Sequence, residues 1–359
     1  MPDRLIFSDF SDAQTSPPLG VPIEVMPGIL WIRLALPFQL NHVNIYLIDD
    51  GDGWAVFDTG LGDKATQAVW TELLADHIDR PLTRLIVTHY HPDHIGMAGW
   101  LAERFRLPVY MSETEYLLSR NIHLDPGALD AAYYRDFYLR HGLDAEATQL
   151  VVTMGHAYLR LVTGLPPTFE RLMTQDRLKI GSRDFAVLTG AGHSPEQIVM
   201  YCETDGLFFC ADQVLNKISP NVSVTATDPN GDPLRYYLSS LDSLAVTIPA
   251  NALALPGHGL PFRNVPGRIS ELKNHHAARC DQIREACRAA PLSVAELVPV
   301  LFHRALDPQQ ISFAFSEILA HVNYLLRQGL LDKVVDAAKR VRYDARPNRS
   351  EIARPWKVT

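Results

Sequence analysis

The chain has 359 residues, enough for about two domains of ~150 residues each. Its content of 47% hydrophobic and 21% charged residues is typical of a globular protein and excludes a disordered or collagen-like chain. No apolar run approaches the ~18 residues that a membrane span needs, so no integral membrane protein is expected. The net charge of -8 is uneven, because residues 266–359 carry 15 Lys and Arg against 10 Asp and Glu. The remaining acidic body would repel polyanions, which disfavours nucleic acid as its partner.

The N-terminal segment and the cysteines indicate the cellular compartment. The first twenty residues lack a basic segment followed by an apolar one, so we expect no secretion and a cytoplasmic location. The four cysteines form no CxxC pair, and we expect free thiols in a reducing environment. They are Cys202, Cys210, Cys280 and Cys287.

The first half of the chain alternates between strand and helix patterns. Two short apolar runs, 43–48 and 54–57, flank an Asp- and Gly-rich turn and predict a hairpin. Apolar residues at helical spacing over 64–76 precede a buried strand at 85–88. Strand, helix and strand in this order predict an α/β layer.

A helical insertion is predicted at about 112–165, where aromatic and apolar residues repeat at helical spacing. Strands are then expected at 185–189, 198–201, 207–210 and 252–255. Pro and Gly crowd residues 256–267, which places a domain boundary there. We therefore expect a catalytic domain at 1–265 and a second domain at 266–359.

The second domain has the outline of a winged helix. Helices are expected at 269–287, from Val294 behind a Ser293 N-cap, and at 309–328, followed by a strand-like segment at 330–335. A basic tail ends the chain. The helix at 309–328 carries Arg327 as its only Lys or Arg, whereas a recognition helix needs several polar or basic residues to reach base edges. Its apolar composition suits packing on the catalytic domain or on a second subunit, as in a homodimer.

One short segment carries most of the chemistry. Residues 88–94 read Thr-His-Tyr-His-Pro-Asp-His and lie where the strand at 85–88 gives way to a helical pattern. His89 and His91 alternate along extended backbone, so they point the same way and can bind one ion, while Asp93 and His94 can reach a second. Three imidazoles and a carboxylate packed together without a cation would leave polar groups unpaired.

Together with four further elements, this segment resembles the metallo-β-lactamase superfamily. The elements follow in the family's order: Asp58-Thr59-Gly60; Gly192-His193-Ser194-Pro195, with Glu196 where Gly is usual; Ala211-Asp212, with Ala in place of Gly; and Gly257-His258-Gly259. The resemblance spans residues 43–260 and implies a mixed α/β fold, the αββα sandwich.

The resemblance implies a binuclear metal site. His89, His91 and His193 would bind one ion, Asp93, His94 and His258 the other, and Asp212 would bridge the two. Such ions hold a hydroxide nucleophile between them and polarise the substrate. Asp93, or a metal-bound water, would return the proton to the leaving group. Asp58 is the natural acceptor for a ligand histidine. Zinc is preferred, with Fe, Mn or Co also compatible.

The presence of Asp212 disfavours a true β-lactamase. With this residue included, the ligand set resembles that of the glyoxalase II, lactonase and ribonuclease groups. We therefore expect a hydrolase acting on a small-molecule acyl substrate, thioester first and lactone or ester next. Residues 268–345 resemble the winged-helix module of some of these hydrolases, not the glutathione-binding domain of glyoxalase II. The alternatives are a metal-dependent endoribonuclease, a DNA-binding regulator with a ligand-sensing hydrolase domain, and a single-iron persulfide dioxygenase.

Eight further histidines lie in helical patterns without partner spacing and are interpreted as ordinary core or surface residues. They are His77, His123, His141, His156, His275, His276, His303 and His321.

Overall fold

A computed structural model describes residues 16–127 and 131–346, so the end of the predicted basic tail, 347–359, lies outside the described residues. The chain divides into two compact units, which we describe separately. The first takes its residues from Met1–Pro126, His156–Pro220 and Ser239–Ser270. The second takes its residues from Gly127–Gly155, Asn221–Leu238 and Glu271–Thr359.

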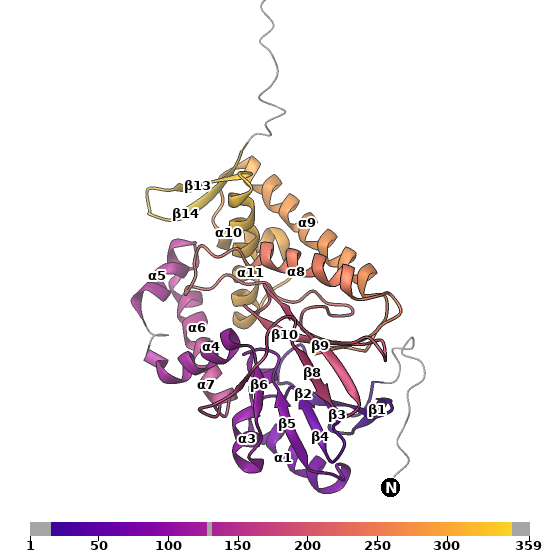
Figure 1. The fold of residues 1–359 in the computed structure, drawn as a ribbon. Helices are drawn as coiled ribbons and strands as arrows, with labels where there is room; N and C mark the ends of the chain where they lie inside the picture. The colour runs from indigo at the N-terminus through magenta and orange to yellow at the C-terminus, as the bar shows by residue number, and fades with distance from the viewer. Residues whose placement is uncertain (1–15, 128–130, 347–359) are drawn as a thin grey trace, which may run out of the picture. The chain divides into compact units, whose positions relative to one another are not determined.

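The first unit contains a seven-stranded sheet in the order β1 to β7 (Figure 1). The predicted hairpin is confirmed, because β3 and β4 pair antiparallel, and β4, β5, β6 and β7 then run parallel. The strands are β1 (Ile23–Met26), β2 (Ile29–Ala35), β3 (His42–Asp49), β4 (Trp54–Phe57), β5 (Leu82–Ile86), β6 (Val109–Met111) and β7 (Glu170–Arg171).

A second sheet of five strands, in the order β12-β11-β10-β9-β8, completes the framework of this unit. Four of its strands match the four predicted ones, and β11 and β12 pair parallel at one edge. The strands are β8 (Arg177–Ile180), β9 (Arg183–Gly190), β10 (Gln197–Cys202), β11 (Leu207–Ala211) and β12 (Leu253–Pro256).

Two apolar cores hold the layers of this unit together. One side of the first sheet packs on the second sheet, and the other side packs on helices α1 (Lys64–Glu72) and α3 (Ala98–Phe105). Strand β3 contains an unbroken apolar run, Ile45–Ile48, because both of its faces are covered: Tyr46 faces the second sheet, whereas Ile45 faces the helices. A strand covered on both faces needs an unbroken hydrophobic run rather than alternation.

Helices account for most of the remaining chain. The segment 112–165, predicted as a helical insertion, contains α4 to α7, and the π-helix η1 extends α1 along the predicted helix 64–76. The further helices are η1 (Leu73–His77), α2 (Pro92–Ile95), α4 (Glu113–Leu124), α5 (Ala132–Arg140), α6 (Ala145–Gly155), α7 (Ala157–Leu161), α8 (Pro233–Thr247), α9 (Val265–Ala289), α10 (Val294–Leu301) and α11 (Pro308–Arg327). None of those in the described ranges is long and apolar enough to cross a membrane.

The second unit ends in α10, α11 and a two-stranded hairpin. Ser293 caps α10 as predicted, through a reciprocal capping box with Glu296. The strand predicted at 330–335 is β13 (Leu331–Val335), and it pairs antiparallel with β14 (Val341–Ala345). Helices followed by a hairpin agree with the predicted outline, and the winged-helix assignment stays a prediction.

Phe209 tests the core between the two sheets. Its ring centroid lies 5.4 Å from that of Tyr46 and 4.9 Å from that of Phe57, and its side chain is fully buried. Phe209→Ala should lower the free energy of unfolding by about 3–5 kcal/mol, because it removes apolar contacts and leaves a cavity. Val246→Ala, at a residue that is 91% exposed, should change it by less than about 0.5 kcal/mol. Equal effects in a denaturant titration would contradict this account of the core.

Candidate metal centre

The predicted ligands lie on loops that follow strands of the two sheets. The first loop leaves β5 and enters the short helix α2, where His91 is the N-cap and Pro92 opens the first turn. Proline suits this position because its missing N–H is one that a helix leaves unpaired. The other ligands follow β9, β11 and β12: they are His193, Asp212 and His258.

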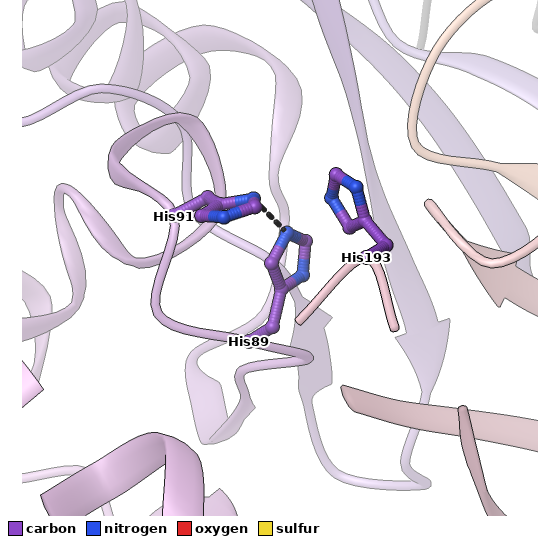
Figure 2. A group of neighbouring side chains, drawn as sticks. All are labelled: His89, His91 and His193. Atoms are coloured by element: carbon purple, nitrogen blue, oxygen red, sulfur yellow. Dashed lines mark hydrogen bonds between the residues drawn. The ribbon is translucent and has the colours of Figure 1, made fainter. Parts of the chain in front are cut away.

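The structure brings all seven predicted ligands together. Their donor atoms form three overlapping groups in which each atom lies within 4.8 Å of the others. The first group agrees with the predicted ligands of one ion (Figure 2), and the third agrees with those of the other. The groups are His89, His91 and His193; His89, His94 and Asp212; and Asp93, His94 and His258.

Asp212 stands between these groups. Its Oδ2 lies 3.5 Å from Nε2 of His94, 3.4 Å from Nε2 of His193 and 3.2 Å from Nε2 of His258. Asp93 approaches the His258 side alone, with its Oδ2 at 3.3 Å from Nε2 of His258 and 3.7 Å from that of His94. One carboxylate is therefore shared among imidazoles of both predicted ions, and the other is not.

Outer hydrogen bonds fix the orientation of two ligand imidazoles. Nδ1 of His94 donates to Oδ2 of Asp58 at 2.8 Å, which is the role that the sequence predicted for Asp58. Nδ1 of His258 donates to the backbone carbonyl of His42, also at 2.8 Å. In both rings Nε2 is the nitrogen that faces the carboxylates and can bind an ion. Partners of this kind set the tautomer of a metal-binding histidine.

Unusual backbone conformations aim the two buried carboxylates. Asp58 has φ 61° and accepts hydrogen bonds from the backbone N–H and the hydroxyl of Thr88. Ala211, directly before Asp212, has φ 44°, in the left-handed region that glycine adopts at least cost. This is the position where the family's usual Gly is replaced. At Gly257 a Cβ would lie 2.3 Å from Oδ1 of Asp212, so the loop before His258 has no room for a side chain.

The electrostatics of the centre favour bound cations. Burial opposes charge on the imidazoles, yet Asp212 and Asp93 raise the pKa of His258 to about 10 and that of His94 well above its usual value. Around His91, burial dominates and lowers the pKa to about 3, which keeps the ring in its neutral, metal-binding form. The carboxylates thus draw positive charge onto the facing rings, at the same place where divalent ions would satisfy them.

These residues fit divalent metal ions. Nε2 of His94 and Oδ1 of Asp212 are buried atoms without a hydrogen-bond partner among the described residues. Buried polar atoms are normally paired, so such orphans at the middle of a donor cluster point to an ion. Five imidazoles and two carboxylates suit zinc, iron, manganese or cobalt.

Glu115, near the start of α4, joins two of the ligand loops and was not predicted from the sequence. Its side chain is buried, its Oε2 accepts from the backbone N–H of Tyr90 at 3.0 Å, and its Oε1 accepts from that of Glu196 at 2.7 Å. Tyr90 lies between His89 and His91, and Glu196 follows the loop of His193. A single carboxylate therefore holds the three imidazoles of one group in register.

Replacing Glu115 should loosen this group. In Glu115→Gln the amide keeps one acceptor oxygen and turns an N–H₂ toward a backbone donor, so one of the two loops loses its anchor. We expect metal affinity to fall by about 10–100-fold, the usual effect of losing an outer-sphere partner. Chelator competition on the full chain measures the affinity. Glu113→Gln, in the same helix turn at a side chain that is 46% exposed and pairs with Arg171, is the matched control, and an equal loss in both variants would refute the role.

Comparison with known proteins agrees with the geometry. A model of the metallo-beta-lactamase superfamily matches residues 39–258, and a model of the metallo-beta-lactamase-like C-terminal domain matches residues 280–346. A beta-lactamase domain protein from Burkholderia ambifaria has a similar crystal structure, with TM-score 0.85 and 38% identity, covering 94% of this chain and 97% of that one. A metallo-beta-lactamase family protein from Thermus thermophilus also has a similar crystal structure, with TM-score 0.75 and 29% identity, covering 90% of this chain and 100% of that one.

Among curated proteins, the atrochrysone carboxyl ACP thioesterase AgnL7 of Paecilomyces divaricatus is 24% identical over 90% of this chain and 91% of its own. A probable metallo-hydrolase of Bacillus subtilis, YqgX, is 25% identical over 64% of this chain and 90% of its own. A hydroxyacylglutathione hydrolase of Halorhodospira halophila is 41% identical, but over only 20% of this chain and 26% of its own. The fold, the ordered ligand set and the match over most of the chain lead to one conclusion: this protein belongs to the metallo-beta-lactamase superfamily of hydrolases.

Proposed function

We propose that the chain is a hydrolase that uses two divalent ions, zinc first, to cleave an acyl bond, with a thioester as the preferred class and a lactone or ester next. The observation that carries the proposal is the position of Asp212. Its Oδ2 lies within 3.5 Å of imidazoles that belong to each of the two predicted ions, as a carboxylate shared by two ions would. A single-ion centre, such as the persulfide dioxygenase considered above, would need no shared carboxylate.

The two aspartates have different surroundings and therefore different roles. Ions bound here would supply an activated water and polarise the acyl carbonyl. The side chain of Asp212 is 7% exposed and surrounded by imidazoles, which suits a fixed ligand. That of Asp93 is 21% exposed, so of the two carboxylates it is the one better placed to accept a proton and return it to the leaving group.

The thioester class is supported by coverage as well as by chemistry. The thioesterase relative aligns with 90% of this chain and 91% of its own length, so it shares both matched regions rather than a ligand loop alone. The hydroxyacylglutathione hydrolase shares 20% of this chain. Glutathione-binding residues are therefore not carried over, and we propose a different small-molecule acyl group.

The C-terminal unit gives little support to nucleic acid as substrate. An exodeoxyribonuclease of Bacillus anthracis, YycJ, is 34% identical, but over 20% of this chain. Helix α11 carries Arg327 as its only Lys or Arg, at its last position. We propose that α10, α11 and the β13-β14 hairpin form a winged-helix module, within a domain that begins at residue 266. Its role would be to pack on the catalytic domain or on a second subunit, and not to bind nucleic acid.

Asp212→Ala tests the proposed centre. Turnover of an acyl thioester should fall by more than about 100-fold, because losing a ligand does at least the damage of losing an outer partner. Metal content should fall with it, while circular dichroism stays that of the native protein. Asp52→Ala, in the exposed turn between β3 and β4, is the control and should keep full turnover. Unchanged turnover in Asp212→Ala would show that this residue is not the shared ligand.

The competing functions are separated by the substrates tested on metal-analysed protein. Thioester, lactone and ester turnover that a chelator abolishes supports the proposal. Cleavage of single-stranded RNA that His91→Ala abolishes, without acyl turnover, would replace it with a ribonuclease. Sequence-specific retention on DNA that survives removal of the ions would replace it with a regulator.

A further inference from the structure

The second unit contains a separate group of metal-type donors. His276 lies on α9, and Glu317 and His321 lie on α11; their donor atoms are all within 4.8 Å of one another. His276 is 1% exposed, His321 is fully buried, and the Glu317 side chain is 13% exposed. None of these three residues belongs to the centre described above.

The spacing along α11 explains two of the three members of this group. Glu317 and His321 are four residues apart, so their side chains leave the same face of the helix on successive turns. His276 then completes the group from α9. A carboxylate and an imidazole on one helix, with an imidazole from a second helix, are a common way of building a metal site between packed helices.

The hydrogen bonds determine which nitrogens are available. Nδ1 of His321 can only donate to the backbone carbonyl of Glu317, at 2.7 Å, so Nε2 carries the lone pair. Nε2 of His321 accepts a hydrogen bond from Nδ1–H of His276 at 3.0 Å, which leaves the lone pair of His276 on Nε2. Nε2 of His276 is buried and has no hydrogen-bond partner among the described residues. Burial lowers the pKa of His276 to about 3 and that of His321 to about 4, so both rings are neutral at pH 7.

Arg279 offers the competing explanation for Glu317, but it leaves the group unsatisfied. Its Nε lies 3.6 Å from Oε1 of Glu317, which is too long for a hydrogen bond, and 3.1 Å from Nε2 of His275. Nη1 of Arg279 and Oε1 of Glu317 are both buried without a hydrogen bond in the part of the chain that is described. An ion pair with Arg279 would still leave one carboxylate oxygen for a metal, and it leaves Nε2 of His276 without a partner among the described residues.

We propose that His276, Glu317 and His321 bind one divalent transition-metal ion, zinc first, which fastens α9 to α11. Two donors at ~2.0–2.1 Å from one tetrahedral zinc are about 3.3 Å apart. The three donor atoms, all within 4.8 Å of one another, need only small side-chain movements to reach this separation, and the hydrogen bond between His276 and His321 would be exchanged for bonds to the ion. The backbone carbonyl that orients His321 is the kind of outer partner that such ligands normally have. The ion would be structural and would take no part in the acyl reaction.

The experiment separates this ion from those of the catalytic centre. The full chain carrying His91→Ala and His258→Ala, one ligand removed from each catalytic group, is dialysed against Zn²⁺ alone and its metal content measured. Adding His321→Gln or His276→Gln to this background should remove about one zinc per chain. It should also abolish the zinc-dependent rise in Tm of the background, because an ion that binds only the folded state stabilises it.

His303→Gln, at an exposed histidine of the same unit, should retain both the zinc and the rise in Tm. Glu317→Gln keeps the shape of the side chain and protects the test against misfolding, since it should weaken zinc binding while circular dichroism stays native. Unchanged zinc content in folded His276→Gln and His321→Gln variants, or a background that binds no zinc, would overturn the proposal and leave the Arg279–Glu317 pair as the explanation.

Discussion

The centre of this protein depends on a buried negative charge that the fold cannot neutralise with hydrogen bonds alone. Asp212 is enclosed by imidazoles and its Oδ1 lacks a hydrogen-bond partner among the described residues. An unpaired carboxylate at such a depth would be very costly, so something positive must face it. Protons on His94 and His258 can play this part, and divalent ions can play it better because they also satisfy the lone pairs of the neutral rings.

The rest of the first unit serves to hold that charge in place. Two sheets with apolar faces fix the strand ends, and the ligands lie on the loops that leave them. The outer partners then remove the remaining freedom: Asp58 orients His94, the His42 carbonyl orients His258, and Glu115 ties two loops together. Each of these contacts acts on a residue of the donor cluster or on the loop that carries it, so together they support the geometry of the centre.

The sequence predicted what side-chain types and short spacing can reveal. Residue type and order alone were enough to identify the run from His89 to His94. The same holds for the ordered elements that contain Asp58, His193, Asp212 and His258. Glu115 escaped because it binds backbone N–H groups, for which no partner residue type is required. His276 and His321 escaped because they lie 45 positions apart, on different helices, and only tertiary packing brings their rings together. Strands β1 and β2 and helix α8 also went unpredicted.

The left-handed conformations at Asp58 and Ala211 connect the stability of this chain to its catalytic geometry. A side chain held in that region costs of order 1–3 kcal/mol, and the surrounding contacts must overcome it. Ala211 stands where the motif that this sequence resembles has glycine, and its methyl group limits the conformations open to the denatured chain, which offsets part of that strain. Thermodynamic robustness and the direction of the Asp212 carboxylate are thus linked through a single rotation of the backbone.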